Sequence, residues 1–156
     1  MRARRDIAAA DYRALAAFRY ELRCFLAFSE QAARAAGIEP QQHQLLLAIR
    51  GLPAGSRPNI RTLAERLCVQ HHTTVALVDH LEERGLVRRE RGKLDKREVL
   101  VRITSPGARL LRRLSHLHRA RLQRVGPELV SALSSIVAGL GQAEPAEAAA
   151  QEPQSA

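Results

Sequence analysis

The strongest constraint on the fold is one strand-like stretch in a chain whose other segments have helical periodicity. In RRERGKLDKREVLVRI, residues 88–103, apolar and polar residues alternate on both sides of GKLD. A period of two predicts β-strands, and the glycine between the two halves predicts a turn. We therefore expect LVRRER and REVLVRI to form a two-stranded antiparallel hairpin in an otherwise helical protein.

Two short helical segments come directly before this hairpin. NIRTLAERLCV is expected to form a helix that Asn59 caps, and QHHTTVALVDHLEERG a second helix that ends at Gly85. The inward positions of the second helix are Thr74, Leu77, Val78 and Leu81. Two short helices joined by a tight turn predict a helix-turn-helix.

Longer helices are expected on both sides of this region. Residues 11–36 carry apolar side chains at three- and four-residue steps and are followed by Gly37 at a C-cap position, and another helix begins at Pro40. A further helix begins at residues 104–106, and Gly126 with Pro127 is expected to break it before a last short helix. The helix over 11–36 is longer than a small domain needs, so part of its apolar face is expected to pack on a second subunit.

The length of 156 residues favours one domain, which we expect over residues 1–141. Residues 142–156 are rich in Ala, Glu, Pro and Gln and predict a disordered tail. No apolar run has the length of a signal peptide or a membrane span, which predicts a cytoplasmic protein without membrane contact. Cys24 and Cys68 lie far apart without a CxxC pattern, so neither a disulfide framework nor a zinc site is predicted.

Positive charge is concentrated around the predicted hairpin. The chain has 25 Lys and Arg against 16 Asp and Glu, a formal net charge of +9. From Arg84 to Arg102, eight basic residues face three acidic ones, which gives +5 in nineteen residues. Such charge could be a solvated surface, but its position directly after a helix-turn-helix favours contact with double-stranded DNA.

A helix-turn-helix followed by a basic hairpin is the winged-helix arrangement, so the predicted fold class is mainly α with a small β-hairpin wing. LAERLCVQHHTTVALVDHLEERGLVRRERGKLDKREVLVRITSPGARLL resembles the DNA-binding core of the MarR family of bacterial transcription regulators, including the Asp-x-Arg wing signature at Asp95, Lys96 and Arg97. The resemblance extends through the long first helix and the C-terminal helices, leaving out the tail. It implies a winged helix-turn-helix at 57–104 and dimerisation helices at 11–36 and 105–141.

The same resemblance implies a homodimer that binds a pseudo-palindromic operator as a repressor and leaves it when a small aromatic effector binds. The sequence itself leaves repression and activation open. The predicted contacts of the recognition helix with DNA are Gln70, His71, His72 and Thr73, with Val75 and Ala76 against thymine methyl groups. Asp79 would repel phosphate, so we expect it to pair with an arginine of the chain.

The predicted wing contacts are Arg91, Lys93, Asp95, Lys96 and Arg97. In the family that the chain resembles, the wing arginine enters the minor groove and the aspartate two residues earlier orients it, which implies these roles for Arg97 and Asp95. Two departures concern the helix-turn-helix. Cys68 stands where a small glycine is common, and Gln70, His71 and His72 replace a Ser-Arg-Pro type of start.

Several alternatives compete with these interpretations. His71 and His72 point about 100° apart on a helix and have no acidic or Cys partner at helical spacing, so no metal and no other cofactor is predicted. Phe28 and His43 could line an effector pocket, and they fit equally well as core residues. No arrangement of a nucleophile, carboxylate pair or phosphate loop predicts an enzyme.

Two other functional classes remain open. Some relatives sense peroxides through a cysteine in the first helix, where Cys24 lies, but Glu21, Tyr20 and Phe28 provide no positive charge to activate its thiol, which favours a structural cysteine. The other class is a basic helical module that binds an acidic protein or a membrane. A membrane-binding hairpin would carry aromatic residues beside its basic ones, and this hairpin has none.

Overall fold

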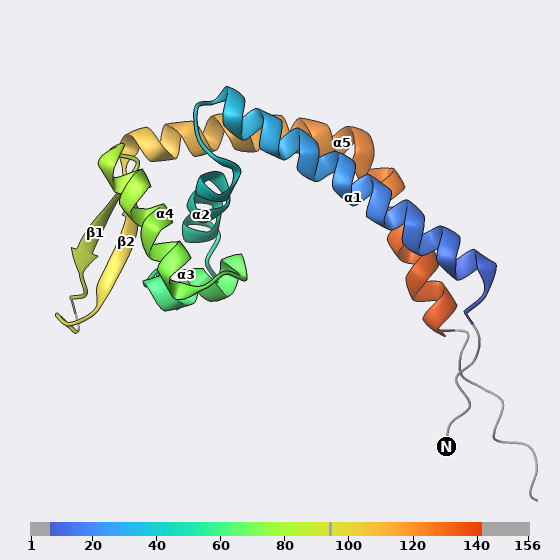
Figure 1. Ribbon diagram of the computed structural model, residues 1–156, viewed down its shortest axis with the longest axis horizontal. Helices are drawn as coiled ribbons and strands as arrows, with labels where there is room; N and C mark the ends of the chain where they lie inside the picture. The colour runs from blue at the N-terminus through green and yellow to red at the C-terminus, as the bar shows by residue number, and fades with distance from the viewer. Residues whose placement is uncertain (1–6, 94, 142–156) are drawn as a thin grey trace, which may run out of the picture. The chain divides into compact units, whose positions relative to one another are not determined.

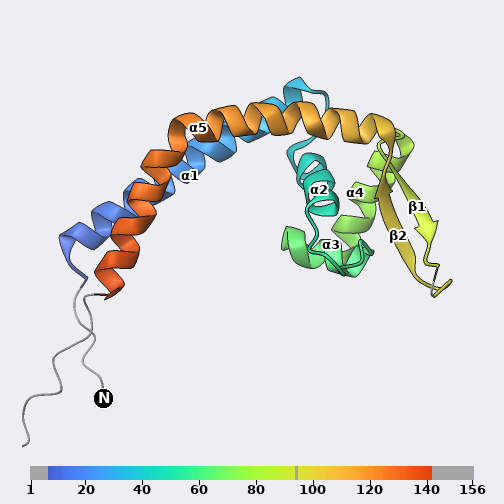
Figure 2. The ribbon, with the colours of Figure 1, turned by 180° about the vertical axis from the view of Figure 1, so that it is seen from behind.

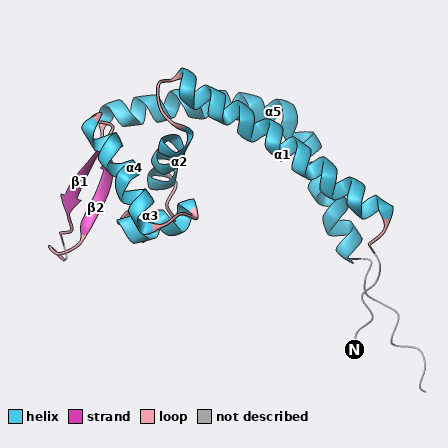
Figure 3. Cartoon of the chain, viewed as in Figure 1, coloured by secondary structure: helices cyan, strands magenta, loops and turns pink. Residues whose placement is uncertain are grey.

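The computed structural model describes residues 7–93 and 95–141. Within this part the fold is mainly helical with one hairpin, as predicted (Figure 3). The elements are α1 (Ala9–Ala35), α2 (Pro40–Arg50), α3 (Ile60–Leu67), α4 (His71–Glu83), β1 (Val87–Arg91), β2 (Val99–Ile103) and α5 (Ser105–Gly141). Residues 27–120 form one compact unit, and the described residues before 27 and after 120 form the other. The predicted tail at 142–156 lies outside the described residues.

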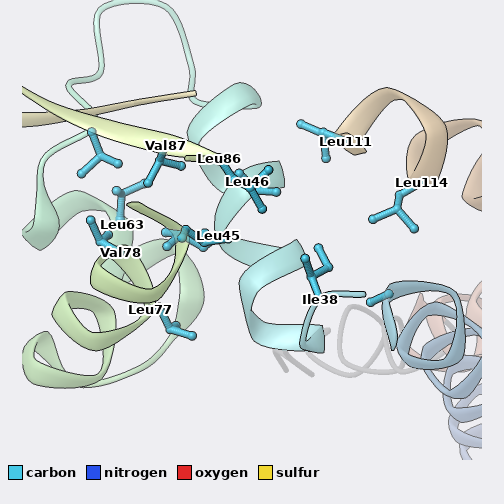
Figure 4. Packing of buried hydrophobic residues seen from close by; sticks show 13 residues of the cluster. Ile38, Leu45, Leu46, Leu63, Leu77, Val78, Leu86, Val87, Leu111 and Leu114 are labelled. Carbon is cyan, nitrogen blue, oxygen red and sulfur yellow. The ribbon is translucent and has the colours of Figure 1, made fainter. Parts of the chain in front are cut away.

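In the unit of residues 27–120, α2 lies between α3 and the first part of α5 (Figures 1 and 2). Its core joins the helices to the base of the hairpin (Figure 4). The largest fully buried side chains are Leu45 and Leu46 of α2, Leu63 of α3, Thr74, Val78 and Leu81 of α4, Val87 and Val101 of the hairpin, and Leu114 of α5. The inward positions predicted for α4 are all buried.

The predicted helix ends are confirmed by their hydrogen bonds. After α1, Gly37 has φ +80°, its N–H donates to Arg34 O at 2.9 Å, and the N–H of Ile38 donates to Ala33 O at 3.1 Å. This is the Schellman arrangement, which a left-handed glycine closes without steric cost. At the start of α3, Asn59 Oδ1 accepts a hydrogen bond from the N–H of Thr62 at 2.9 Å.

Cys68 closes α3 in the left-handed conformation, with φ +54° and ψ +41°. Its N–H donates to Glu65 O at 3.2 Å, and the N–H of Val69 donates to Ala64 O at 3.1 Å. The tight turn of the helix-turn-helix therefore keeps the geometry that a glycine would give it. An L-residue adopts this geometry at a cost of roughly 1–2 kcal/mol.

The two strands pair antiparallel, with Val87 opposite Ile103 at the base and Arg91 opposite Val99 near the tip. The N–H of Val101 donates to Pro58 O at 2.8 Å, which ties β2 to the segment before α3. At the base, a Cβ on Gly107 would lie 2.1 Å from Leu86 O, so only glycine allows α5 to start this close to the hairpin. These contacts fix the base of the hairpin and leave its tip projecting.

The predicted break at Gly126 and Pro127 is wrong, because α5 continues through both residues to Gly141. Proline removes one backbone donor and restricts the residue before it, mainly through a clash with that residue's N–H and Cβ. Gly126 has no Cβ, so part of the clash is absent. The helix predicted for 11–36 also differs slightly, since α1 begins at Ala9 and ends at Ala35.

The other unit consists of the first part of α1 and the last part of α5. Ala132 is its only buried residue among those described. The large hydrophobic side chains that it exposes are Ile7, Tyr12, Leu15, Tyr20, Leu26, Leu122, Val130, Leu133 and Val137. An open groove of about 730 Å³ runs between the two helices, lined by Ala10, Ala14 and Ala17 on one side and Pro127, Ser131 and Ala132 on the other. The two helices therefore bury little apolar surface in a single chain.

Replacement of Cys68 by glycine is expected to raise the free energy of unfolding by about 0.5–1 kcal/mol, because relief of the left-handed backbone outweighs the entropy cost of glycine. Urea denaturation at one fixed protein concentration measures this change. Cys68→Ala removes the thiol and keeps the left-handed strain, so it serves as the control and should differ little from the parent. Equal gains in both variants would assign the effect to the thiol.

Candidate nucleic-acid interface

The recognition helix α4 starts with an exposed polar end. Gln70 is its N-cap residue, with φ −71° and ψ +153°, and its side chain makes no capping hydrogen bond. Gln70, His71, His72 and Ala76 are exposed, and Thr73 and Val75 are half-buried. All six predicted recognition residues thus lie at the N-terminal half of α4 with some access to solvent. The first N–H groups of a helix lack partners within the helix and carry partial positive charge, which suits phosphate.

Arg89 of β1 binds two carboxylates of α4. Its guanidinium pairs with Asp79 at 2.5 Å and also with Glu82. In addition, the backbone N–H of Arg89 donates to Glu82 Oε1 at 2.8 Å. Burial lowers the pKa of Arg89, but the hydrogen bonds and charges of Asp79 and Glu82 outweigh it and raise that pKa. The predicted pairing of Asp79 with an arginine is confirmed, and the pair joins the recognition helix to the wing.

Other charges of the hairpin are also paired within the chain. Glu90 pairs with Arg88 at 2.5 Å and lies 3.6 Å from Arg102, and Glu98 pairs with Arg57 at 2.7 Å. Three of the eight basic residues counted from 84 to 102, Arg88, Arg89 and Arg102, are therefore paired with carboxylates of the chain. The accessible positive charge of the hairpin is smaller at its base than the sequence suggests.

The tip of the wing keeps its charge. Lys93, Lys96 and Arg97 are exposed, and within the described part of the chain none of them has an ion pair. Asp95 Oδ1 accepts a hydrogen bond from the backbone N–H of Arg97 at 2.8 Å, and Arg91 Nη1 donates to Lys96 O at 3.2 Å. Asp95 thus holds the backbone of the turn, and the structure brings all five predicted wing residues together.

Phe28 and His43, the predicted effector-pocket pair, meet through a third ring that the sequence did not indicate. His118 of α5 stacks on His43 with ring centroids 4.8 Å apart and an interplanar angle of 19°, and it meets Phe28 edge-on at 5.9 Å. His118 lies 89 residues from its partner Ser29, so no local pattern could have revealed it. His43 is only 3% exposed.

The hydrogen bonds of His118 place a proton on its Nδ1. This atom lies 2.6 Å from Leu114 O, which can only accept, so Nδ1 donates. Its Nε2 forms a second hydrogen bond with Ser29 Oγ at 2.7 Å. His43 Nδ1 is buried and has no hydrogen-bond partner among the described residues. Burial, followed by the charge of His118, lowers the pKa of His43 to about 4.

No group of three or more His, Cys, Asp or Glu residues in the described ranges is placed to hold a metal ion. In the same ranges, no helix combines the length and apolar character needed to cross a membrane. Cys24 is half-buried, Cys68 is exposed, and both are free thiols.

Replacement of Glu82 by alanine is expected to lower the free energy of unfolding by about 1–3 kcal/mol, because two charge-assisted hydrogen bonds to Arg89 are lost. Asp79→Ala is the matched control. The Asp79 side chain is 49% exposed against 36% for Glu82, and it makes no bond to the backbone of β1, so we expect a loss of at most about 1 kcal/mol. Equal losses in urea denaturation would show that the backbone bond of Glu82 adds nothing.

The lowered pKa of His43 predicts a loss of stability in acid. In the unfolded chain His43 binds a proton near pH 6.5, but in the folded chain only near pH 4. The contribution of His43 to the free energy of unfolding is complete above about pH 6.5. It falls by at most about 3 kcal/mol as the pH is lowered towards 4. Unfolding free energies measured between pH 7.5 and roughly pH 4.5 should fall more steeply for the parent than for His43→Leu. Parallel curves would rule out His43 as the titrating group.

Comparison with known proteins agrees with this geometry. The MarR family model matches residues 36–98, which include the helix-turn-helix and most of the hairpin. The search of curated proteins finds no match for the chain. Among solved structures, the chain is similar to AbsC, a MarR family transcriptional regulator from Streptomyces coelicolor, with 20% identity and a TM-score of 0.65 over 88% of this chain and 99% of AbsC.

Two further similar structures contain ligands. The transcriptional repressor CouR bound to a 23-mer DNA duplex has 27% identity and a TM-score of 0.60, over 79% of this chain and 87% of CouR. CouR from Rhodococcus jostii RHA1 bound to p-coumaroyl-CoA has 24% identity and a TM-score of 0.60, over 80% of this chain and 88% of CouR. The family model and the winged helix-turn-helix described above identify residues 36–98 as the DNA-binding region of a MarR family transcriptional regulator, and the similar structures share the fold of the chain.

Proposed function

We propose that this regulator is a homodimeric repressor that binds a pseudo-palindromic operator and is released from it by a small-molecule effector. The observation that carries the DNA-binding part is the distribution of charge on the hairpin. Cations at its base are paired within the chain, whereas Lys93, Lys96 and Arg97 at its tip are exposed and unpaired among the described residues. As a member of the MarR family the protein is a regulator and not an enzyme.

In this proposal the two elements contact different grooves. The N-terminal end of α4 enters the major groove, where Gln70, His71, His72 and Thr73 offer hydrogen bonds to base edges and phosphates. Val75 and Ala76 supply the apolar contacts with thymine methyl groups. Arg97 enters the neighbouring minor groove, and Asp95 holds the turn backbone from which Arg97 projects.

The homodimer is supported by the unit formed by the start of α1 and the end of α5. Tyr12, Tyr20, Val130 and Val137 are each at least 59% exposed, which is unusual for such large apolar side chains on one pair of helices. A second copy that packs against these helices would bury this surface. Two lobes related by a two-fold axis would then meet half-sites roughly 10 base pairs apart.

Release by a small-molecule effector is supported by a cavity in this chain and by solved structures of similar fold. Relatives of similar fold are known in complex with p-coumaroyl-CoA and with DNA. In this chain a cavity of about 360 Å³ lies where the end of α1 meets the start of α2, and it reaches Leu77 and His80 of the recognition helix. Its lining does not include Phe28 or His43, whose rings pack with His118. An effector in this cavity would touch α4 directly.

Arg97→Ala is expected to weaken binding to the duplex from the intergenic region beside the gene by about 1–3 kcal/mol, the range of a good groove contact. Fluorescence anisotropy with scrambled competitor DNA measures this affinity.

Arg50→Ala is the matched control, because it removes the same charge from an exposed position at the end of α2. Its affinity should stay within about twofold of the parent, since a remote exposed charge acts only through screened long-range attraction. Equal losses of affinity in both variants would show that the wing acts only as part of a general basic surface. Parent protein that shows no preference over scrambled DNA would instead favour the protein-interaction module.

A further inference from the structure

A second concentration of positive charge lies on the first part of α5, outside the surface assigned to the operator. Residues 105–127 contain no Asp or Glu. The exposed basic side chains in this segment of the 27–120 unit are Arg109, Arg112, Arg113, His116 and Arg119, which we call the α5 arginine face. None of these arginines has an ion pair with a described residue, in contrast to the arginines at the base of the hairpin.

Helical geometry places these side chains together. The steps from Arg109 to Arg112, Arg113 and His116 are three, four and seven residues, which bring side chains to one side of a helix. Leu111 and Leu114, which are 5% and 0% exposed, mark the opposite side that packs in the core. The α5 arginine face is therefore the solvent side of the helix, about 15 Å long at 1.5 Å per residue.

This face is directed away from the residues that would contact the operator. The C-terminal end of α4 meets the start of α5, where Thr104 Oγ1 donates to Gly85 O at 2.6 Å. The recognition residues lie at the other end of α4, about 20 Å away for a helix of 13 residues. The hairpin runs from the same joint, so its tip is also remote, and within this unit α2 and α3 lie on the core side of α5 (Figures 1 and 2). A straight duplex held by α4 and the wing tip does not reach the α5 arginine face.

The composition of the face favours phosphate over other anions. Interfaces between proteins depend on buried apolar or aromatic anchors, whereas interfaces with nucleic acids are more polar and strongly positive. One large hydrophobic side chain borders the face, Leu117, which is 47% exposed and stands four residues after Arg113. A single leucine beside four arginines is not the cluster of apolar anchors that a protein interface needs, and the face has no Phe, Tyr or Trp for a membrane surface. Arginine forks bind phosphate oxygens in pairs and need no sequence information.

We propose that the α5 arginine face binds the phosphate backbone of a second DNA segment without reading its sequence. One molecule can then hold the operator on α4 and the wing while α5 holds another duplex or a distant part of the same DNA. This activity goes beyond the proposed repressor function and does not need an effector.

A capture experiment tests the proposal. The intergenic duplex is immobilised, loaded with full-length protein and washed, and a fluorescent duplex of unrelated sequence is then added in roughly 50 mM salt, where phosphate contacts are strong. The parent should retain the second duplex. Arg109→Gln/Arg112→Gln/Arg113→Gln should retain about tenfold less, because three phosphate contacts are lost, and its affinity for the first duplex should change less than about twofold.

Two control variants separate charge, contact and folding. Arg19→Gln/Arg23→Gln/Arg50→Gln removes three exposed arginines from α1 and α2 and should retain the second duplex like the parent. Arg109→Lys/Arg112→Lys/Arg113→Lys keeps the charge and should retain most of the capture. If the lysine variant captures and the glutamine variant does not, while both unfold at the urea midpoint of the parent, a folding defect is ruled out.

Equal capture by the parent and the glutamine variant, or no capture by the parent, would overturn the proposal. Polyglutamate that displaces the second duplex better than unlabelled DNA of equal charge would also overturn it and assign the face to an acidic protein. Lys93→Ala/Lys96→Ala/Arg97→Ala separates the proposed operator contacts from the proposed role of the α5 arginine face, because it should weaken binding of the intergenic duplex only. If this variant binds the intergenic duplex like the parent, the proposed operator contacts fail while the α5 result stands.

Discussion

The interaction on which the DNA-binding surface depends is the contact of Arg89 with Asp79 and Glu82. A two-stranded hairpin is marginally stable by itself, so the wing needs to be held by the rest of the domain. Val87 and Val101 bury the base of the hairpin in the core, but apolar contacts have little directional preference. The charged contact adds direction, because Glu82 binds both the guanidinium and the backbone N–H of Arg89. It sets the orientation of the wing relative to α4, and the proposed contacts with two adjacent grooves require this.

The same contact explains why net charge is a poor guide to the site. The hairpin region has a net charge of +5 in sequence, yet Arg88, Arg89 and Arg102 face carboxylates in the structure. An arginine that is already paired has to break that contact before it can bind phosphate. Charge therefore remains available at the wing tip and on α5, where few or no acidic residues lie nearby. The distribution of carboxylates, more than that of arginines, defines the basic surfaces of this protein.

Local patterns predicted what depends on local physics. The helices, the hairpin and the caps at Gly37 and Asn59 follow from periodicity and backbone preferences over a few residues, and the structure confirms them. The predicted break at Pro127 failed because its effect depends on the residue before it, which here is glycine. His118 was missed because its contacts with Ser29 and His43 join segments far apart in the chain. The roles assigned to Gln70, His71, Arg97 and the other site residues stay predictions.

The unit built from the start of α1 and the end of α5 links stability to assembly in the proposed homodimer. Tyr12, Leu15, Val130 and Val137 remain exposed in one chain, and Ala132 is the only residue buried in the described part of this unit. At roughly 25 cal/mol for each Å² of apolar surface, a partner that covers these side chains would stabilise the two helices. In the proposed homodimer, stability would then depend on protomer concentration. Binding to two half-sites requires the same association, so dilution would lower operator affinity and stability together.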